Sequence, residues 1–404
     1  MTSRTGVVGA VFFMLLCLAC GLAASDDPVI TVNGSGTLLK DGKPYRAIGV
    51  NYFSAFRRLI QNPRDTSFRD GFSVLKRRNI PFIRFMAGGF WPNEWECYLK
   101  HKADYFNRFD TFVRAAEQQQ IGLIPSMFWH TATVPDIVGE PRSAWGDPDS
   151  ETIAFMRRYV REVVTHYLDS PAIWAWEFGN EYNLAADLPN AARHRPPIVP
   201  HWGTPATRSE ADDMTHDMVV TACAEFAKAV RLHDKERPIT TGHSRPRPAA
   251  HHMRTEGTWT RDTREQFMAN LQAVTPDPVN MISIHLYPED ENANRFGEDM
   301  PELEEIVELA MKASEAAGKP LFIGEFGAGE DYDPAGGEWE DTRQANLAII
   351  RIIERNDVPL AAHWVFDLPQ QDDTHNVTAA NNRAYILDAI GRANHRIAQD
   401  LQKR

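Results

Sequence analysis

Two glutamates stand where they could carry out acid–base and nucleophilic chemistry. Glu181 follows the apolar segment IWAWEFGN, and Glu325 follows LFIG and precedes FGAG. If both segments are strands of one parallel barrel, their carboxyl ends meet at one face, so the two carboxylates can approach each other. Such a pair is what cleavage of a glycosidic bond requires: one group protonates the leaving oxygen, and the other attacks the anomeric carbon or activates water. Taken alone, each glutamate could equally be a surface charge.

Polar or aromatic residues also end most of the other apolar segments that we predict to be strands. They are Arg84 in FIRF, His130 in SMFWH, Asn180 directly before Glu181, His285 and Tyr287 in SIHLY, and Trp364 in AAHWVFD. Their recurrence at strand ends favours a functional site over scattered surface charges.

The elements that must position these residues alternate along the chain. Helical patterns such as Ser150–Asp169 and Pro301–Gly318 have apolar residues on one face. They separate short apolar segments that are typical of a parallel sheet covered by helices. The predicted strands are Arg46–Tyr52, Phe82–Met86, Gly122–Trp129, Ile173–Asn180, Ile239–Gly242, Met281–Tyr287, Leu321–Phe326 and Ala361–Phe366. Eight such units predict an α/β fold, a (β/α)8 TIM barrel.

The rest of the chain fits one catalytic domain over residues 26–404. Before the barrel, the turn residues Asn33-Gly34 and Asp41-Gly42 predict a small β-meander. Two long polar connections, at about 182–209 and 244–262, follow the fourth and fifth strands. Because they emerge at the carboxyl ends of strands, we expect them to be walls or lids of the site rather than disordered insertions.

Residues 1–25 read as a secretory signal peptide. Arg4 precedes the apolar run VVGAVFFMLLCLAC and the small residues GLAAS. We therefore expect a secreted or periplasmic protein with no stable membrane association. Two alternatives are an uncleaved anchor and lipid attachment at Cys20.

Composition excludes several classes of partner and chemistry. The 404 residues carry a formal charge of −12, which disfavours nucleic acid and anionic membranes and suits a neutral substrate. Beyond the predicted signal peptide, which contains Cys17 and Cys20, the sequence has no CxxC, HExxH, GxSxG or GxGxxG motif, so we expect no metal or other cofactor. After removal of the signal peptide two cysteines remain, Cys97 and Cys223, and they could be bridged or unpaired. We expect a monomer.

The order of these strand-end residues resembles the order found in glycoside hydrolase family 5, the cellulase and β-mannanase family of the large retaining barrel clan. Its sequence of Arg, His, Asn-Glu, His-x-Tyr, Glu and Trp is matched by Arg84, His130, Asn180-Glu181, His285-x-Tyr287, Glu325 and Trp364. The resemblance runs from about Gly42 to the C-terminus.

The resemblance implies a role for each residue. Glu325 is the nucleophile, stabilised as a carboxylate by Arg84 and Tyr287. Glu181 is the general acid and base, and we expect its pKa to be raised by the charge of Glu325 and by aromatic surroundings.

Substrate contacts are implied for the remaining residues. Asn180 would hydrogen-bond the sugar 2-hydroxyl, and His130 and His285 would bind hydroxyls or orient the carboxylates, unless they are buried structural histidines. Trp364 would form the floor under the reacting sugar. Trp91, with Phe90 and Trp95, would add further platforms, and Trp129, Trp145 and Trp202 are weaker candidates, since each could instead be core.

The expected activity is hydrolysis of a β-1,4-linked polysaccharide with retention of configuration. The segments SPAIWAWEFGNEYN and HLYP are more similar to the β-mannanases than to the cellulases, so mannan or glucomannan is the favoured substrate. Tyr182-Asn183 departs from the proline that often follows the acid/base, and the two long connections could close one end of the cleft. An endoglucanase, an exo-acting β-glycosidase and a non-catalytic carbohydrate-binding barrel therefore stay open.

Overall fold

The computed structural model describes residues 2, 30–288, 295–296, 303–329 and 339–403. Apart from residue 2, the signal peptide predicted at 1–25, including Cys20, lies outside these residues, as does Pro301, the predicted start of a helix. Both therefore stay predictions.

Eight parallel strands form one sheet in the order β8-β7-β6-β5-β4-β11-β10-β9. An isolated parallel bridge between Thr240 and Met281 joins the two end strands, which brings the sheet close to a complete barrel. The predicted TIM barrel is confirmed. The strands are β4 (Ala47–Asn51), β5 (Phe82–Met86), β6 (Gly122–Phe128), β7 (Trp176–Gly179), β8 (Ile239–Thr240), β9 (Ile282–Leu286), β10 (Leu321–Phe326) and β11 (Leu360–His363).

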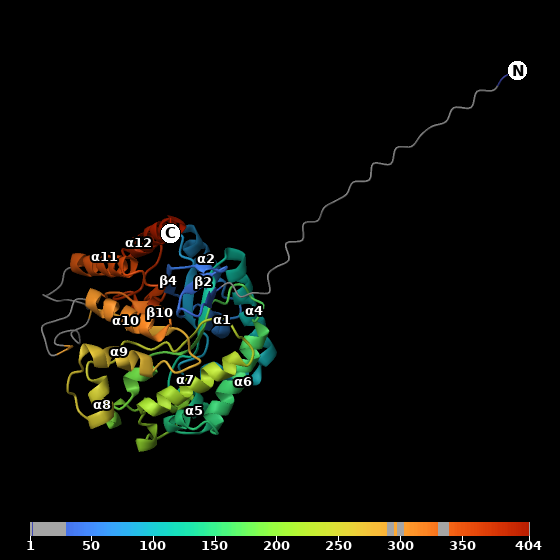
Figure 1. The fold of residues 1–404 in the computed structure, drawn as a ribbon. Coiled ribbons are helices and arrows are strands. Elements are labelled where there is room, and N and C mark those ends of the chain that lie inside the picture. Colours follow the sequence, from blue (N-terminus) through green and yellow to red (C-terminus); the bar gives the residue numbers. More distant parts are fainter. Residues whose placement is uncertain (1, 3–29, 289–294, 297–302, 330–338, 404) are drawn as a thin grey trace.

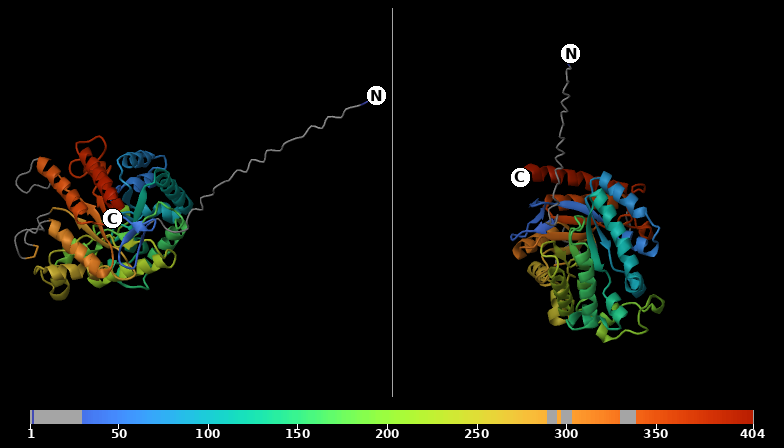
Figure 2. Two further views of the ribbon diagram at one scale, coloured as in Figure 1. Left: turned by 45° about the horizontal axis from the view of Figure 1, so that its top comes forward. Right: turned by 90° about the vertical axis from the view of Figure 1, so that its right-hand side faces the viewer.

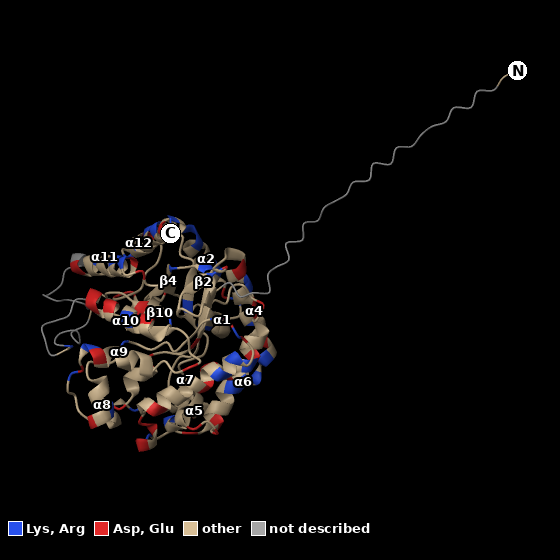
Figure 3. Cartoon of the chain, in the orientation of Figure 1, with Lys and Arg blue, Asp and Glu red and all other residues tan. Residues whose placement is uncertain are grey.

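Helices surround this sheet on its outer side, as Figures 1 and 2 show. They are α1 (Ala55–Gln61), α2 (Ser67–Arg77), α3 (Glu96–Lys100), α4 (Lys102–Gln119), α5 (Thr133–Val138), α6 (Glu151–His166), α7 (His216–Arg231), α8 (Ala250–Glu256), α9 (Arg264–Ala273), α10 (Leu303–Ala317), α11 (Trp339–Arg355) and α12 (Ala384–Lys403). In the described part of the chain, no helix is both long and apolar enough to cross a membrane. Acidic and basic positions are interspersed over the visible helices (Figure 3).

Helix α6 shows how the sequence determines where a helix begins and which of its faces is buried. Ser150 precedes it as N-cap, and its side chain accepts a hydrogen bond from the Ile153 amide at 3.1 Å, which satisfies one of the free amides of the first turn. Met156, Val160 and Val163 recur on one face, and all are fully buried. The predicted face is therefore the one that packs against the barrel.

A small antiparallel sheet, β1 (Ile30–Val32), β2 (Leu38–Lys40) and β3 (Lys43–Pro44), forms the predicted meander. Asp41 and Gly42 both have positive φ, as the two-residue hairpin between β2 and β3 requires. Ile30 and Leu38 share a buried cluster with barrel residues such as Phe82. Because Phe82 begins its strand, the meander covers the amino-terminal end of the barrel, opposite the strand ends that carry the predicted site.

The two long connections are more ordered than their composition indicates. The first contains several 3-10 turns, including η3 (Tyr182–Ala185) and η5 (Pro200–Trp202), and the second contains helix α8. Met253 and Ala249 of the second connection pack against Leu188 of the first. Each connection thus supplies an apolar partner for the other.

Candidate active site

A hollow of about 510 Å³ lies at the carboxyl ends of the strands, where the sequence places the candidate residues. Every strand of the barrel except β4 contributes residues to this hollow, either from its carboxyl end or from the loop that follows it. The lining residues are Phe90, Trp129, Asn180, Glu181, Leu184, Ser244, Arg245, Arg247, Tyr287, Glu325 and Trp364.

Glu325 lies on β10 with its side chain only 7% exposed. Arg84 donates from Nη1 to one carboxylate oxygen at 2.8 Å, and the Tyr287 hydroxyl donates to the other at 2.7 Å. Burial first, and the charge of Glu325 second, raises the pKa of Tyr287 well above its usual value, so this hydroxyl keeps its proton. Both oxygens of Glu325 are therefore held by donors, as an ionised carboxylate needs.

Glu181 faces the same hollow from the residue after Asn180, with its side chain 32% exposed. Its backbone has a positive φ of 54°, and its amide donates to the Gly242 carbonyl at 2.9 Å. Gly242 allows this close crossing, because a Cβ there would lie 1.9 Å from the Gly179 carbonyl oxygen. Glu181 is thus directed into the hollow by the backbone as well as by its side chain.

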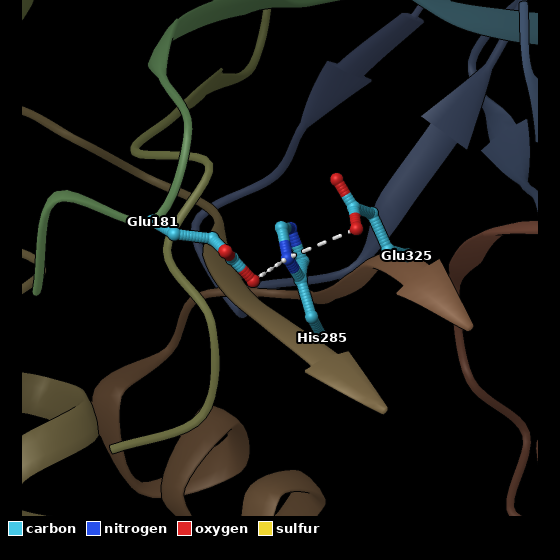
Figure 4. Close-up of side chains that lie close together, drawn as sticks. All are labelled: Glu181, His285 and Glu325. Atoms are coloured by element: carbon cyan, nitrogen blue, oxygen red, sulfur yellow. Dashed lines mark hydrogen bonds and ion pairs between the residues drawn. The ribbon is translucent and has the colours of Figure 1, made fainter. Parts of the chain in front are cut away.

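His285 lies between the two glutamates, as Figure 4 shows. Its Nδ1 is 2.7 Å from a carboxylate oxygen of Glu181 and 3.5 Å from one of Glu325. These two oxygens and Nδ1 all lie within 4.8 Å of one another. The two carboxylates therefore face each other at short range, which residue spacing alone could not establish.

The expected rise in the pKa of Glu181 is wrong for the free enzyme. Burial does raise this pKa, but the hydrogen bond and charge of His285, together with the charge of Arg84, outweigh burial and lower it. Repulsion from Glu325 predicted the rise, whereas the contact with His285 on β9 reverses it. In the free site, a 2.7 Å hydrogen bond therefore joins His285 Nδ1 to the Glu181 carboxylate.

Arg84 connects more groups than the sequence indicates. Its Nε donates to both oxygens of Glu177, at 2.8 and 2.9 Å, and its Nη1 also reaches Asn51 Oδ1 at 3.1 Å. Its guanidinium lies over the ring of Trp129, 4.7 Å from the centroid. Sequence reasoning missed Glu177 and Asn51, although a charged residue within the apolar run IWAWEFG was the signal that could have found Glu177.

Asn180 and Trp364 both line the hollow. Asn180 Oδ1 accepts from Arg84 Nη2 at 2.7 Å, which fixes the amide so that its NH2 group is left to donate within the hollow. The Trp364 ring stacks beside Trp129, with centroids 6.1 Å apart, and its Nε1 donates to Gln371 at 2.9 Å. A ring fixed in this way provides a flat apolar surface for a sugar.

Other candidates lie elsewhere. His130 and Trp91 do not line the hollow but stack on each other with centroids 6.4 Å apart. Burial, with help from nearby arginines, lowers the pKa of His130 to about 4, so it is neutral near pH 7. Trp95 and Trp145 are buried in the core and are not platforms.

The departure at Tyr182-Asn183 has a structural reason. Tyr182 is fully buried, and its hydroxyl donates to the Phe128 carbonyl at 2.9 Å. Asn183 forms two hydrogen bonds with the backbone of Ser244. These residues therefore anchor the first long connection to the core and to the second connection.

The remaining cysteines are free thiols, with Cys97 partly exposed on α3 and Cys223 buried on α7. Glu181, His285 and Glu325 are also residue types that bind metals, and among the described residues they form a group of suitable size. Hydrogen bonds account for their close approach, so the arrangement does not call for a metal ion.

Comparison with known proteins agrees with this geometry. The family model described as cellulase (glycosyl hydrolase family 5) matches residues 40–366. Mannan endo-1,4-β-mannosidase F of Aspergillus fumigatus is 24% identical over 261 residues, which cover 62% of this chain and 50% of that protein. The chain thus spans about half the length of the curated relatives it matches first.

Solved structures are similar in fold over most of the chain. The endo-1,4-β-mannanase of Rhizomucor miehei has a TM-score of 0.63 at 15% identity and covers 92% of this chain and 99% of its own. A family 5 mannosidase of the same organism has a TM-score of 0.63 at 11% identity and covers 93% of this chain and 100% of its own. At these identities the likeness concerns the fold alone.

Proposed function

This chain belongs to glycosyl hydrolase family 5, and on that premise we propose that it is a secreted β-glycoside hydrolase that cleaves β-1,4-linked mannan or glucomannan with retention of configuration. The observation that carries the proposal is the approach of Glu181 and Glu325, whose facing oxygens lie within 4.8 Å of each other. Retaining enzymes hold their two carboxyl groups about 5–5.5 Å apart, whereas inverting enzymes need about 6.5–9.5 Å to admit a water.

The different surroundings of the two carboxylates divide the roles. Glu325 is buried and accepts hydrogen bonds from Arg84 and Tyr287, which suits a nucleophile that must start ionised. Glu181 is more exposed and contacts one proton carrier, His285, which suits a group that takes up and releases a proton in each cycle.

In the first step, a Glu325 oxygen attacks the anomeric carbon while Glu181 gives its proton to the glycosidic oxygen. The bond to the leaving sugar breaks, and an ester joins the remaining sugar to Glu325. In the second step, Glu181 removes a proton from water, which attacks the same carbon and releases Glu325 as a carboxylate. Two inversions at one carbon leave the configuration unchanged.

Binding of substrate supplies the protonated form of Glu181. A bound sugar displaces water from the hollow, and this desolvation raises the pKa of Glu181 and favours its protonated form. Asn180 donates to the 2-hydroxyl, and Trp364 stacks on the apolar face of the reacting sugar.

The preference for mannan over cellulose is supported by the mannanase-like segments of the sequence and by the curated relatives, which include a mannan endo-1,4-β-mannosidase. The two long connections pack together next to Glu181. This packing favours a substrate cleft that is narrower at the end near Glu181.

Product analysis on mannan, glucomannan, carboxymethyl cellulose and xylan tests the substrate. We expect the highest rate on mannan or glucomannan, with a mixture of oligosaccharides as products. Equal or faster cleavage of carboxymethyl cellulose would make the protein an endoglucanase, and release of mannose alone would make it exo-acting. Absence of hydrolysis of any substrate, including an activated aryl β-glycoside, would leave a carbohydrate-binding barrel.

Secretion is tested separately by sequencing the N-terminus of the exported protein. We expect the mature chain to begin near Ser25–Asp27. An intact Met1 in a membrane-bound fraction would contradict this proposal.

A further inference from the structure

A second cavity of about 610 Å³ lies next to the catalytic hollow. Both volumes are within the range of about 300–1,000 Å³ that is usual for ligand sites. Its walls come from α1, from the loop between β5 and α3, and from the first turns of α4. Trp202, on the first long connection, covers one side of it.

The segment 87–94, between β5 and α3, contributes residues to both spaces. Phe90 lines the catalytic hollow, whereas Trp91 lines the second cavity. Glu94 holds this segment in place, because its carboxylate accepts from the Phe90 amide at 2.6 Å. On the other side, Thr133 donates from its hydroxyl to the Phe90 carbonyl at 2.6 Å. A ligand in the second cavity would therefore lie one loop away from a substrate in the first.

Aromatic rings and a fixed ion pair give the second cavity its chemistry. The rings of Trp91 and Trp202 lie 4.5 Å apart, and Trp202 is 38% exposed, so part of its surface is left for a ligand. Arg57 donates from Nε to Glu94 at 2.5 Å, with their side chains 33% and 11% exposed. Such a pair presents donors and acceptors side by side, as the neighbouring hydroxyls of a sugar require.

The charges around the cavity cancel. Its charged lining residues are Arg57 and Arg108 against Glu94 and Glu96, which is two of each sign. A strongly charged ligand would leave this balance uncompensated, whereas a neutral polyhydroxyl ligand would not. Aromatic faces, paired polar groups and zero net charge together indicate a saccharide.

We propose that this cavity is a second saccharide-binding site, which holds a neutral segment of the polysaccharide while another segment occupies the catalytic hollow. The inference rests on the proposed function for the identity of the polymer. It also gives Trp91, which the sequence predicts to be a further sugar platform, a contact with substrate outside the catalytic hollow.

Trp202→Ala tests the site, with Trp259→Ala as matched control. Trp259 is 51% exposed and lines neither cavity. We expect Trp202→Ala to raise KM for glucomannan about fivefold with little change in kcat, since loss of one aromatic contact costs on the order of 1 kcal/mol. Its kcat/KM for an aryl β-mannoside, which is too short to reach both cavities, should stay within about twofold of the wild type.

The same variants are compared by affinity electrophoresis in gels that contain glucomannan. Retardation of Trp202→Ala should be weaker than that of the wild type and of Trp259→Ala. This measurement needs no hydrolysis, so it distinguishes failure of the second site from failure of the proposed enzymatic function.

Two outcomes would overturn the proposal. One is an unchanged KM and unchanged retardation for Trp202→Ala. The other is an equal loss of activity on the polymer and on the aryl glycoside, because Trp202 would then serve only to hold the first long connection in place.

Discussion

Arg84 and Glu177 form an ion pair in which neither side chain is exposed to solvent, with Arg84 Nε 2.8 Å from one carboxylate oxygen and 2.9 Å from the other. The remaining guanidinium nitrogens reach Glu325 and Asn180. Glu177 therefore fixes the arginine that in turn fixes the proposed nucleophile and the amide beside the acid/base.

Replacement of Glu177 should affect both stability and activity. Glu177→Ala leaves the buried charge of Arg84 only partly compensated, so we expect the free energy of unfolding to fall by about 3–5 kcal/mol and kcat to fall as Arg84 shifts. Urea denaturation followed by tryptophan fluorescence measures the first effect. Glu96→Ala, which breaks the exposed pair with Lys100, is the control and should leave the denaturation midpoint unchanged. Equal midpoints for the two variants would contradict this role of Glu177.

Removal of His285 should raise the pKa of Glu181. Burial alone raises this pKa, and the hydrogen bond and charge of His285 are the main causes that lower it. A general acid loses activity as pH rises through its pKa, so a higher pKa moves this loss to higher pH. In His285→Ala, the basic limb of kcat/KM for a substrate with a poor leaving group should shift upward. A limb that moves to lower pH would show that His285 does not lower the pKa of Glu181.

Two buried histidines should make the fold sensitive to mild acid. Burial first, and nearby histidines second, lowers the pKa of His243 and of His363 from 6.5 to about 3. Between pH 6.5 and 5 the unfolded chain binds protons at these positions and the native protein does not, so stability falls as pH falls. We expect a loss of about 1–2 kcal/mol for each histidine over this range.

Urea denaturation at several pH values measures this loss. The variant His363→Gln should show a smaller decrease between pH 6.5 and 5 than the wild type, whatever its stability at neutral pH. An equal decrease in both proteins would assign the effect to other groups.

The strands were predictable because each barrel strand is a short apolar run between amphipathic helices. All eight were found, and the errors lie at their ends. The segment Ile173–Asn180 was expected to be one strand, but β7 comprises only Trp176–Gly179, and Ile173 pairs with Leu123 through an isolated bridge. Helix α8 was missed because its apolar partner, Leu188, is distant in sequence. Sequence periodicity cannot show contacts of this kind.

For the candidate site, the sequence predicted which residue types lie at the strand ends, but it did not predict which side chains contact one another. The order of residues placed Glu181 and Glu325 on one face, whereas the contact of His285 with Glu181 depends on how β9 and β7 close around the barrel. Likewise, Phe90 and Trp91 are neighbours in sequence, yet they line different cavities. The direction of a side chain in a loop is set by tertiary contacts such as that of Glu94 with the Phe90 amide.

The double-displacement mechanism is tested most directly by the configuration of the glycosyl azide that forms when azide is added to variants of the two glutamates. Glu181→Ala should still form the ester with a dinitrophenyl β-glycoside, because this leaving group needs no proton, and azide should then displace Glu325. NMR of the product from Glu181→Ala should show the β-glycosyl azide. Glu325→Ala has no nucleophile and should give, if anything, the α-azide by direct attack. An α-azide from Glu181→Ala, or a β-azide from Glu325→Ala, would contradict the assignment of the two residues.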